Sequence, residues 1–375
     1  MVAPASPEMH GRTRVTDAER AAQALVPEKV EEIVAAFDAR GIFVLEDVVP
    51  LEVCSQLAVK MLADAAAIVA HGGWAARGEF GHGHLQLGQP RMGPFVHPEV
   101  VANPIVEQVV VAILRQNAKL GFFNGNCAMP GSGIQRLHMD DQWDYHSPSE
   151  AAAAGEAWPH RTTSVHVNIC PTGDVTPENG ATEVWPGSHT VYTAHRGNGD
   201  PLADETFVNR RREVQPPDRN CFPAGAVAFR DARIWVRAYN TATHIMMKFT
   251  PVIRILSQNH TALMCSFHLC ARVCHGVQHR GVPNHSPYPR PNIVLVYHRQ
   301  NRTRALTNTP GLLFSESARA AFARENPSID RNVNFVPGPV NHFGASHGPG
   351  GALLGEPDPS YLGMLKELPT ASSRL

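Results

Sequence analysis

Apolar and polar residues follow a helical period in the first part of the chain. Thr16 and Glu19 have the spacing of a capping box, in which each side chain satisfies a backbone N–H group at the start of a helix. Apolar residues then recur at intervals of three and four from Val30 to Phe37, and Gly41 ends the pattern. This stretch predicts an amphipathic helix that ends at the glycine.

The period changes further along the chain. The pattern predicts a short strand at residues 42–49 and amphipathic helices at 50–69 and 106–117. From about Lys119, short apolar runs alternate with turns rich in Gly, Pro and Asn, which is typical of a β-sandwich or jelly roll. These runs lie at residues 120–129, 135–141, 162–171, 182–189, 224–235 and 291–300, and one more helix is predicted within 315–326.

Composition supports this picture and excludes some classes of partner. The chain has 375 residues, with 30 Gly and 31 Pro, so many turns are available. We therefore expect a mainly β fold with flanking helices. The net charge of -1 gives no reason to expect nucleic acid or a membrane surface as partner.

Targeting and redox signals are few. The first residues lack the apolar stretch of a signal peptide, and no run reaches the roughly 18–20 apolar residues of a membrane span. Seven irregularly spaced cysteines indicate a reducing compartment without a disulfide framework. The chain ends in Ser373-Arg374-Leu375, a variant of the peroxisomal address, so we expect a peroxisomal or cytoplasmic protein.

Residues 135–141 contain a candidate metal site. On a strand, residues two apart point to the same face, so His138 and Asp140 would aim a nitrogen and an oxygen at one point. Two such ligands are part of a 2-His-1-carboxylate triad, which leaves open positions on Fe(II). The alternative is a surface histidine beside an aspartate that caps a turn.

A third ligand is expected from a later strand. We choose His279, because Arg290 lies eleven residues further on and can return on the neighbouring strand into the same pocket. Arginine pairs bidentately with a carboxylate. His285 is expected in the solvated turn between them, and His275 precedes the motif.

At this point the chain resembles a known family. The blocks QRLHMD, DVTPENGATEVWPGSH and HRGVPNHSPYPR followed by IVLVYH are similar, in order and spacing, to the phytanoyl-CoA dioxygenase family of Fe(II)/2-oxoglutarate oxygenases. The resemblance covers roughly residues 41–299. It implies a double-stranded β-helix (jelly-roll or cupin-like) core and a reaction that uses O2 and converts 2-oxoglutarate into succinate and CO2.

The same resemblance assigns residues to roles. It implies His138, Asp140 and His279 as the catalytic iron ligands, and Arg290 as the partner of the distal carboxylate of 2-oxoglutarate. Gln135 and Thr182 match positions that contact this cosubstrate in several members. His189, in PGSH, resembles a ligand, but in the family this motif shapes a turn.

Two further groups have open interpretations. Ser164, His166 and Asn168 share one strand face, which could line the pocket or form the outer polar face of an edge strand. The loop residues 143–145 are candidate substrate contacts, with ordinary loop packing as the alternative.

Residues 236–278 differ from the rest of the chain. The segment has 43 residues, four of them basic and none acidic, and it contains three of the seven cysteines. When it is removed, Trp235 joins His279 and the sequence matches the family without a gap. Our hypothesis is a retained intron translated in frame, because Val236 and Gln278 can be encoded by codons that contain the GT and AG of splice sites. The alternatives are a genuine insertion, such as a lid or dimerisation arm, and a small metal knuckle built from Cys265, Cys270, Cys274 and His268.

The predicted organisation has three parts. Residues 1–40 form an N-terminal extension and helix, 41–310 the oxygenase domain with the anomalous insertion, and 311–375 a C-terminal wrapping or lid segment. The predicted function is oxidation of a small hydrophobic substrate, such as a secondary metabolite or a fatty-acyl thioester, by hydroxylation, desaturation or epoxidation. The alternative is an inactive β-helix scaffold disabled by the insertion. The partner is a small molecule, and the protein is expected to be a monomer or homodimer.

Overall fold

The computed structural model describes residues 11–70, 84–85, 90–132, 137–141, 143–192, 205–237, 284–300, 311–338 and 340. Gln135, His279 and the C-terminal tripeptide therefore lie outside the described residues. So does the segment 236–278, apart from its first two residues.

The N-terminal elements follow the predicted pattern closely. They are β1 (Gly11–Arg14), α1 (Asp17–Ala22), α2 (Pro27–Arg40), β2 (Ile42–Glu46) and α3 (Leu51–Ala70). The capping box between Thr16 and Glu19 is present, and Gly41 ends α2 with a φ of 76°. The predicted single helix is broken into two because Pro27 lacks an N–H group and disfavours a helical residue before it.

The later part of the chain contains mostly short strands, with a few helices between them. Its elements are β3 (His84–Leu85), α4 (Pro98–Val101), α5 (Pro104–Leu114), β4 (Ala118–Ala128), α6 (Pro148–Ala153), β5 (Ser164–Ile169), β6 (Glu183–Val184), η2 (Ser188–Thr190), α7 (Glu205–Val214), β7 (Asp218–Arg219), β8 (Val227–Asp231), β9 (Val236–Arg237), β10 (Arg290–Arg299), β11 (Leu312–Ser315), η5 (Glu316–Phe322), β12 (Ile329–Asp330) and β13 (Val333–Val336).

Two sheets form the core of the fold. The larger has the order β1-β2-β8-β5-β10-β4-β12, with β3 also paired to β4, and its pairs from β2 to β4 are antiparallel. The smaller has the order β7-β6-β9, and an isolated bridge between His138 and Val236 extends it. From β5 to β10 the chain passes back and forth between the larger sheet (β5, β8, β10) and the smaller sheet (β6 with β7, then β9), which is the arrangement of a double-stranded β-helix. The predicted fold class is confirmed.

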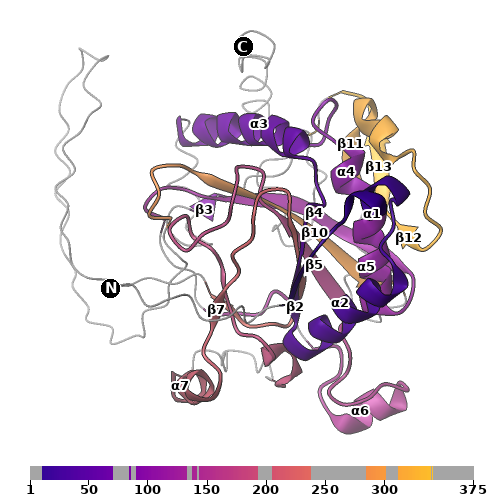
Figure 1. Cartoon of the computed structure of the whole chain (residues 1–375), viewed down its shortest axis with the longest axis vertical. Coiled ribbons are helices and arrows are strands. Elements are labelled where there is room, and N and C mark those ends of the chain that lie inside the picture. The colour runs from indigo at the N-terminus through magenta and orange to yellow at the C-terminus, as the bar shows by residue number, and fades with distance from the viewer. Residues whose placement is uncertain are drawn as a thin grey trace, which may run out of the picture.

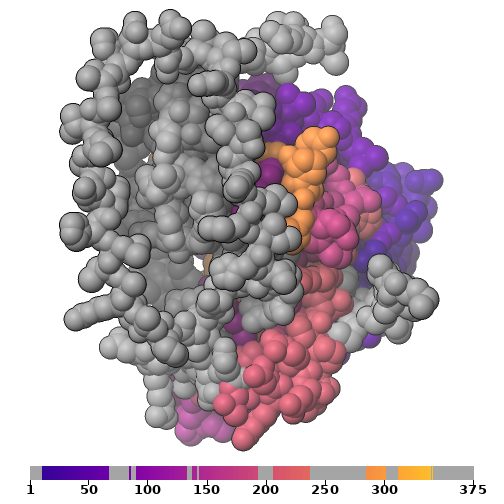
Figure 2. Space-filling view, turned by 90° about the vertical axis from the view of Figure 1, so that its left-hand side faces the viewer, coloured from indigo at the N-terminus to yellow at the C-terminus, as the bar shows by residue number. Residues whose placement is uncertain are grey.

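The helices lie on the outer face of the larger sheet. Side chains from α2, α3 and α5 share one apolar core with Phe123, Val167, Phe229 and Leu295 of the sheet. Figure 1 shows α2 beside β2 and α5 beside β5 and β10, with α7 on the opposite side of the molecule. In Figure 2 the salmon residues 205–237 and the orange residues 284–300 lie on the same face of the molecule.

Strand alternation leaves a polar inner face opposite that core. Because successive side chains point to opposite sides, the neighbours of the core residues face the interior of the β-helix. These inward residues include Asn124 on β4, His166 on β5, Arg230 on β8 and Val296 on β10. In register, His166 is paired with both Arg230 and Val296, so the three form one row across the sheet.

Two predicted elements differ from expectation. Residues 135–141 do not form a strand within the described part, because only His138 pairs, and Asp140 lies in a bend whose next residue donates its N–H to the carbonyl of Ala232. The helix predicted within residues 315–326 is the 3-10 helix η5. The four described cysteines, Cys54, Cys127, Cys170 and Cys221, carry free thiols, and Cys265, Cys270 and Cys274 lie outside the described residues.

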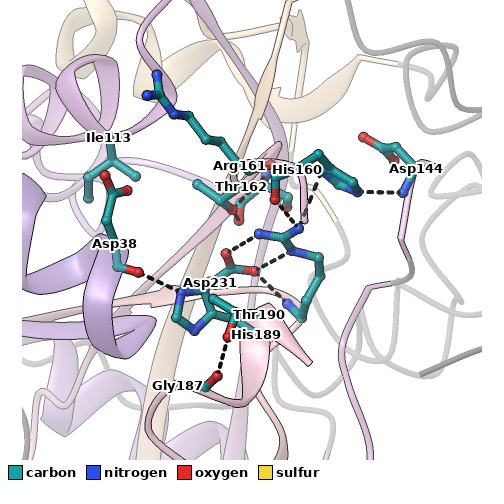
Figure 3. A network of polar contacts seen from close by, with 12 residues as sticks. Asp38, Ile113, Asp144, His160, Arg161, Thr162, Gly187, His189, Thr190 and Asp231 are labelled. Atoms are coloured by element: carbon teal, nitrogen blue, oxygen red, sulfur yellow. Dashed lines mark hydrogen bonds and ion pairs between the residues drawn. The ribbon is translucent and has the colours of Figure 1, made fainter. Parts of the chain in front are cut away.

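A buried ion pair anchors the loop beyond Asp140. Asp231 and Arg233 form two side-chain hydrogen bonds, of 3.0 and 2.7 Å, and both side chains are buried. The guanidinium of Arg233 also donates to the carbonyl of His160 and stacks 4.7 Å from the ring centroid of Trp143. Figure 3 shows that His160 Nε2 in turn accepts a hydrogen bond from the backbone N–H of Asp144. The loop is therefore fixed to the end of β8.

The ion pair controls the protonation of Asp231. Burial by itself would raise the pKa of Asp231, but the charge and hydrogen bonds of Arg233 lower it to about 2 from the usual 3.8. Because the pKa of Asp231 is lower in the folded than in the unfolded state, its ionised form stabilises the fold at pH values above the unfolded-state pKa. This contribution is lost as the pH falls towards the folded-state pKa.

We predict that Asp231→Asn lowers the free energy of unfolding at pH 7 by about 3–5 kcal/mol, because it leaves the buried charge of Arg233 unpaired. Urea unfolding at pH 7 and at pH 3 measures this. The difference in unfolding free energy between wild type and Asp231→Asn should be smaller at pH 3, since the wild-type carboxylate starts to accept a proton between pH 3.8 and about 2. Asp17→Asn, at a fully exposed side chain, is the control. An equal gap at both pH values would contradict the role of the Asp231 charge.

Candidate metal and cosubstrate site

The two predicted ligands of the described region lie together although they are not on a strand. The backbone of His138 exchanges two hydrogen bonds with Val236, of 3.0 and 2.9 Å, which fixes its position at the edge of the small sheet. The chain then bends, and His138 Nε2 lies 3.4 Å from Asp140 Oδ1. The bridge and the bend therefore bring His138 and Asp140 together, whereas the sequence pattern predicts this proximity from alternation along one strand.

The second oxygen of Asp140 contacts the larger sheet. Arg230 Nη2 lies 2.5 Å from Asp140 Oδ2, and His166 Nδ1 lies 3.5 Å from the same oxygen. Burial by itself would raise the pKa of Asp140, but the charge of Arg230 and the hydrogen bond from His138 hold that pKa well below its usual value. Asp140 is therefore a carboxylate with Oδ2 occupied by Arg230 and Oδ1 directed to His138.

His166 has a defined tautomer in this arrangement. Burial lowers the pKa of His166 to about 4, so its ring is neutral near pH 7. Arg230 Nη2 lies 3.2 Å from His166 Nδ1, and a guanidinium can only donate, so Nδ1 is the acceptor and the proton is on Nε2. His166 thereby supports Arg230 rather than competing with it for Asp140.

The donor pair fits a small divalent cation. Neighbouring ligands about 2.1 Å from an octahedral metal lie roughly 3 Å apart, close to the separation of His138 Nε2 and Asp140 Oδ1. An imidazole nitrogen with a carboxylate oxygen is also a donor set that iron accepts. Within the described ranges, no group of three His, Cys, Asp or Glu side chains could hold a metal, and the predicted third ligand, His279, lies outside them.

Val236 occupies the position directly across from His138. Residues paired in an antiparallel bridge project their side chains to the same face, with Cβ atoms about 5 Å apart. The Val236 side chain is buried with Ile42, Val184 and Ile234, in the interior between the sheets. The residue that follows Trp235 is thus the one whose side chain lies beside His138.

Arg290 lies further along the same inner face. It is the first residue of β10, six residues before the Val296 row that meets Asp140. Its guanidinium is mostly buried and donates from Nε and Nη2 to the carbonyls of Asn179 and Gly180, both at 2.8 Å. Thr182 lies two residues after Gly180, so Arg290 and Thr182, the two predicted cosubstrate contacts in the described residues, are near the same turn. Gln135 falls outside the described residues.

The other candidates separate into inner and outer positions. Ser164, His166 and Asn168 are buried on a central strand between β8 and β10, so the edge-strand interpretation is wrong. His189 is buried, and its Nε2 lies 3.1 Å from the carbonyl of Asp38 at the end of α2, which agrees with a turn-shaping role (Figure 3). His285 is exposed, as expected for a solvated turn.

The loop after Asp140 mainly packs against itself. Trp143 is buried among Trp158, His160 and Tyr192, with ring centroids 5.1–5.6 Å apart. Tyr145 stacks edge-on with His160 at 5.1 Å. Loop packing therefore accounts for Trp143.

Sequence reasoning missed Arg230. The only available signal was the alternation in residues 226–230, which places Arg230 on the face opposite Phe229. Its partner, Asp140, lies ninety residues earlier in the chain and on another element, so no local pattern could have paired the two.

Comparisons with known proteins identify the family of the chain. The family description "Phytanoyl-CoA dioxygenase (PhyH)" matches residues 37–243, a range that contains His138 and Asp140 but ends before His279 and Arg290. The dioxygenase peniF of Penicillium patulum is 29% identical over 123 residues, which cover 29% of this chain and 39% of that protein. The match thus spans about two fifths of the length of this relative.

Solved structures with a similar course of the chain include two proteins from nogalamycin biosynthesis. The non-heme α-ketoglutarate-dependent epimerase SnoN matches with a TM-score of 0.41 and 16% identity, over 76% of this chain and 90% of that chain. The α-ketoglutarate-dependent carbocyclase SnoK matches with a TM-score of 0.42 and 15% identity, over 72% and 83% of the two chains. Because the family match covers more than half of the sequence, the chain belongs to the phytanoyl-CoA dioxygenase family and is a member of the iron- and 2-oxoglutarate-dependent dioxygenases.

Proposed function

We propose that the protein oxidises a small hydrophobic molecule at a carbon centre, with conversion of 2-oxoglutarate into succinate and CO2. The observation that carries this proposal is the pair His138 Nε2 and Asp140 Oδ1, 3.4 Å apart, with Asp140 held by Arg230 of the sheet whose inner face also carries Arg290. Bound iron and 2-oxoglutarate would supply the O2-dependent oxidation of a C–H bond. The chain supplies ligands, orientation and a closed pocket.

Asp140 acts in this proposal as a ligand through one oxygen. Arg230 holds Oδ2, so Oδ1 is the oxygen that faces the metal position beside His138. A hydrogen-bonded second oxygen fixes the carboxylate orientation, which is how outer contacts tune metal sites. Arg230 is therefore a positioning residue of the metal centre.

Arg290 would neutralise the distal carboxylate of 2-oxoglutarate. Two of its N–H groups already bind carbonyls of the Asn179–Gly180 turn, which fixes the plane of the guanidinium. Within the described residues, no hydrogen bond uses Nη1, so this nitrogen can reach a ligand carboxylate. Thr182, after the same turn, and Gln135 are the proposed further contacts.

Two substrate classes are proposed, a secondary metabolite and a fatty-acyl thioester. The partial likeness to a fungal dioxygenase supports dioxygenase chemistry. Within the described residues, no helix is long and apolar enough to cross a membrane. We propose a monomer or homodimer that acts on a small molecule, divided into the parts 1–40, 41–310 and 311–375.

We predict that His138→Ala lowers iron affinity and 2-oxoglutarate-dependent succinate formation at least 100-fold, because it removes one of the two described metal donors. Both quantities are measured in the full chain and in a chain without residues 236–278. His285→Ala, at an exposed histidine, is the matched control and should leave both unchanged. Succinate formation that persists in His138→Ala would overturn the ligand assignment.

One observation favours a second candidate, a β-helix scaffold without activity. Val236 lies directly opposite His138, where a third ligand would complete the metal centre. In a chain that lacks residues 236–278, His279 follows Trp235 and takes this place. We therefore propose that the segment 236–278 weakens the metal centre, and that the form without it is the active enzyme.

We predict that deletion of residues 236–278 raises the affinity for Mn²⁺ at least tenfold over the full chain, and that Val236→His in the full chain does the same. Isothermal titration of Mn²⁺ into each purified protein measures this. Val184→His, in the same apolar cluster but not paired with His138, is the matched control. Tight Mn²⁺ binding by the full chain that disappears in His279→Ala would show that His279 already serves as ligand, and would overturn this second proposal.

A further inference from the structure

Among the described residues, four asparagines lie on the floor of the β-helix between the Val296 row and Arg290, and two of them flank Val294. On β4, Asn124 is paired with Val294 of β10, and on the other side Val294 is paired with Asn168 of β5. Residues paired in this way share a face, so the two amides flank Val294, about 10 Å apart across two strand spacings. They form what we term the amide row.

The side chain of Asn124 is buried without a hydrogen bond. It is 1% exposed, and neither Nδ2 nor Oδ1 has a partner among the described residues. Its neighbour Phe123 packs on the outer face against Phe314, at 5.3 Å between ring centroids, so Asn124 points inward. Buried amides in native proteins nearly always have partners, and an unpaired one destabilises the fold. A ligand that enters the β-helix would supply the missing partner.

The position of the amide row selects the part of the ligand that it meets. Along β10 it is two residues from the Val296 row that meets Asp140, and four residues from Arg290. Any molecule that reaches from the metal position to Arg290 must pass over the row. The end of that molecule nearer the metal is the end that the amides face.

We propose that Asn124, together with Asn168, binds the oxo-acid end of 2-oxoglutarate, an inference that rests on the proposed function. Carboxylate and oxo groups only accept hydrogen bonds, so the Nδ2 group of Asn124 donates to this end of the cosubstrate. The buried Asn168 approaches from the other side of Val294. Asn124 Oδ1 accepts a hydrogen bond from an ordered water or from a substrate hydroxyl.

The test uses Asn124→Leu, which keeps the size and removes the polar atoms. Two quantities are measured in the full chain, and in the chain without residues 236–278, both without turnover: the melting temperature of the ligand-free protein, and the Kd of 2-oxoglutarate in the presence of Mn²⁺ and the absence of O2. We expect the melting temperature to rise, because an unpaired buried amide is removed, and Kd to increase at least tenfold. Asn334→Leu, at an exposed position on β13, is the matched control and should leave Kd unchanged.

The outcomes separate this inference from the proposed function. If neither wild-type form binds 2-oxoglutarate with Mn²⁺, the proposed function fails. If a wild-type form binds and Asn124→Leu binds equally well, only the inference fails. A lower melting temperature with unchanged Kd would show that Asn124 serves the fold rather than the ligand. Asn124→Asp, which places a negative charge beside the ligand carboxylate, should weaken binding still further if the inference holds.

Discussion

The contact between Arg230 and Asp140 joins the two sheets at the site. Asp140 lies in a bend beyond the small sheet, whereas Arg230 belongs to a central strand of the larger one. Removing Asp140 would leave the buried charge of Arg230 uncompensated, which is far more costly than losing a surface pair. The contact also decides the chemistry, since it keeps Asp140 ionised and leaves Oδ1 facing His138. The geometry of the metal position therefore depends on this one pair more than on the bend that carries Asp140.

The end of β8 holds the site from both sides. Arg230 points into the β-helix and binds Asp140, while the next residue, Asp231, points outward and binds Arg233. Arg233 then fixes the loop that follows Asp140 through His160 and Trp143. Because side chains alternate along a strand, Arg230 contacts the proposed metal ligand Asp140, whereas Asp231 contacts Arg233, which holds the loop that follows Asp140. Neither contact would survive a shift of β8 by one residue, because every side chain would change face.

Sequence reasoning succeeded where the signal was local. The capping box at Thr16, the stop at Gly41 and most strands follow from spacing within a few residues. It placed His138 and Asp140 together for a reason that proved wrong, since they do not share a strand but are joined by a bridge and a bend. It missed Arg230, and it left His166 and Asn168 undecided, because whether a strand is central or at an edge depends on its partners. A single sequence without pairing information does not contain that fact.

The position of the 43-residue segment matters more than its length. The entropy of closing a loop grows slowly with loop length, so an insertion between two strands is usually tolerated. This one begins at the residue paired with His138, and in the proposed form without the segment His279 would take the place of Val236. Val236 fits the apolar surroundings there and gives the bridge a normal backbone, so the fold accepts the change. A metal centre does not, because valine offers no donor atom. Val236 therefore keeps the backbone bridge to His138 intact but provides no ligand for the proposed metal.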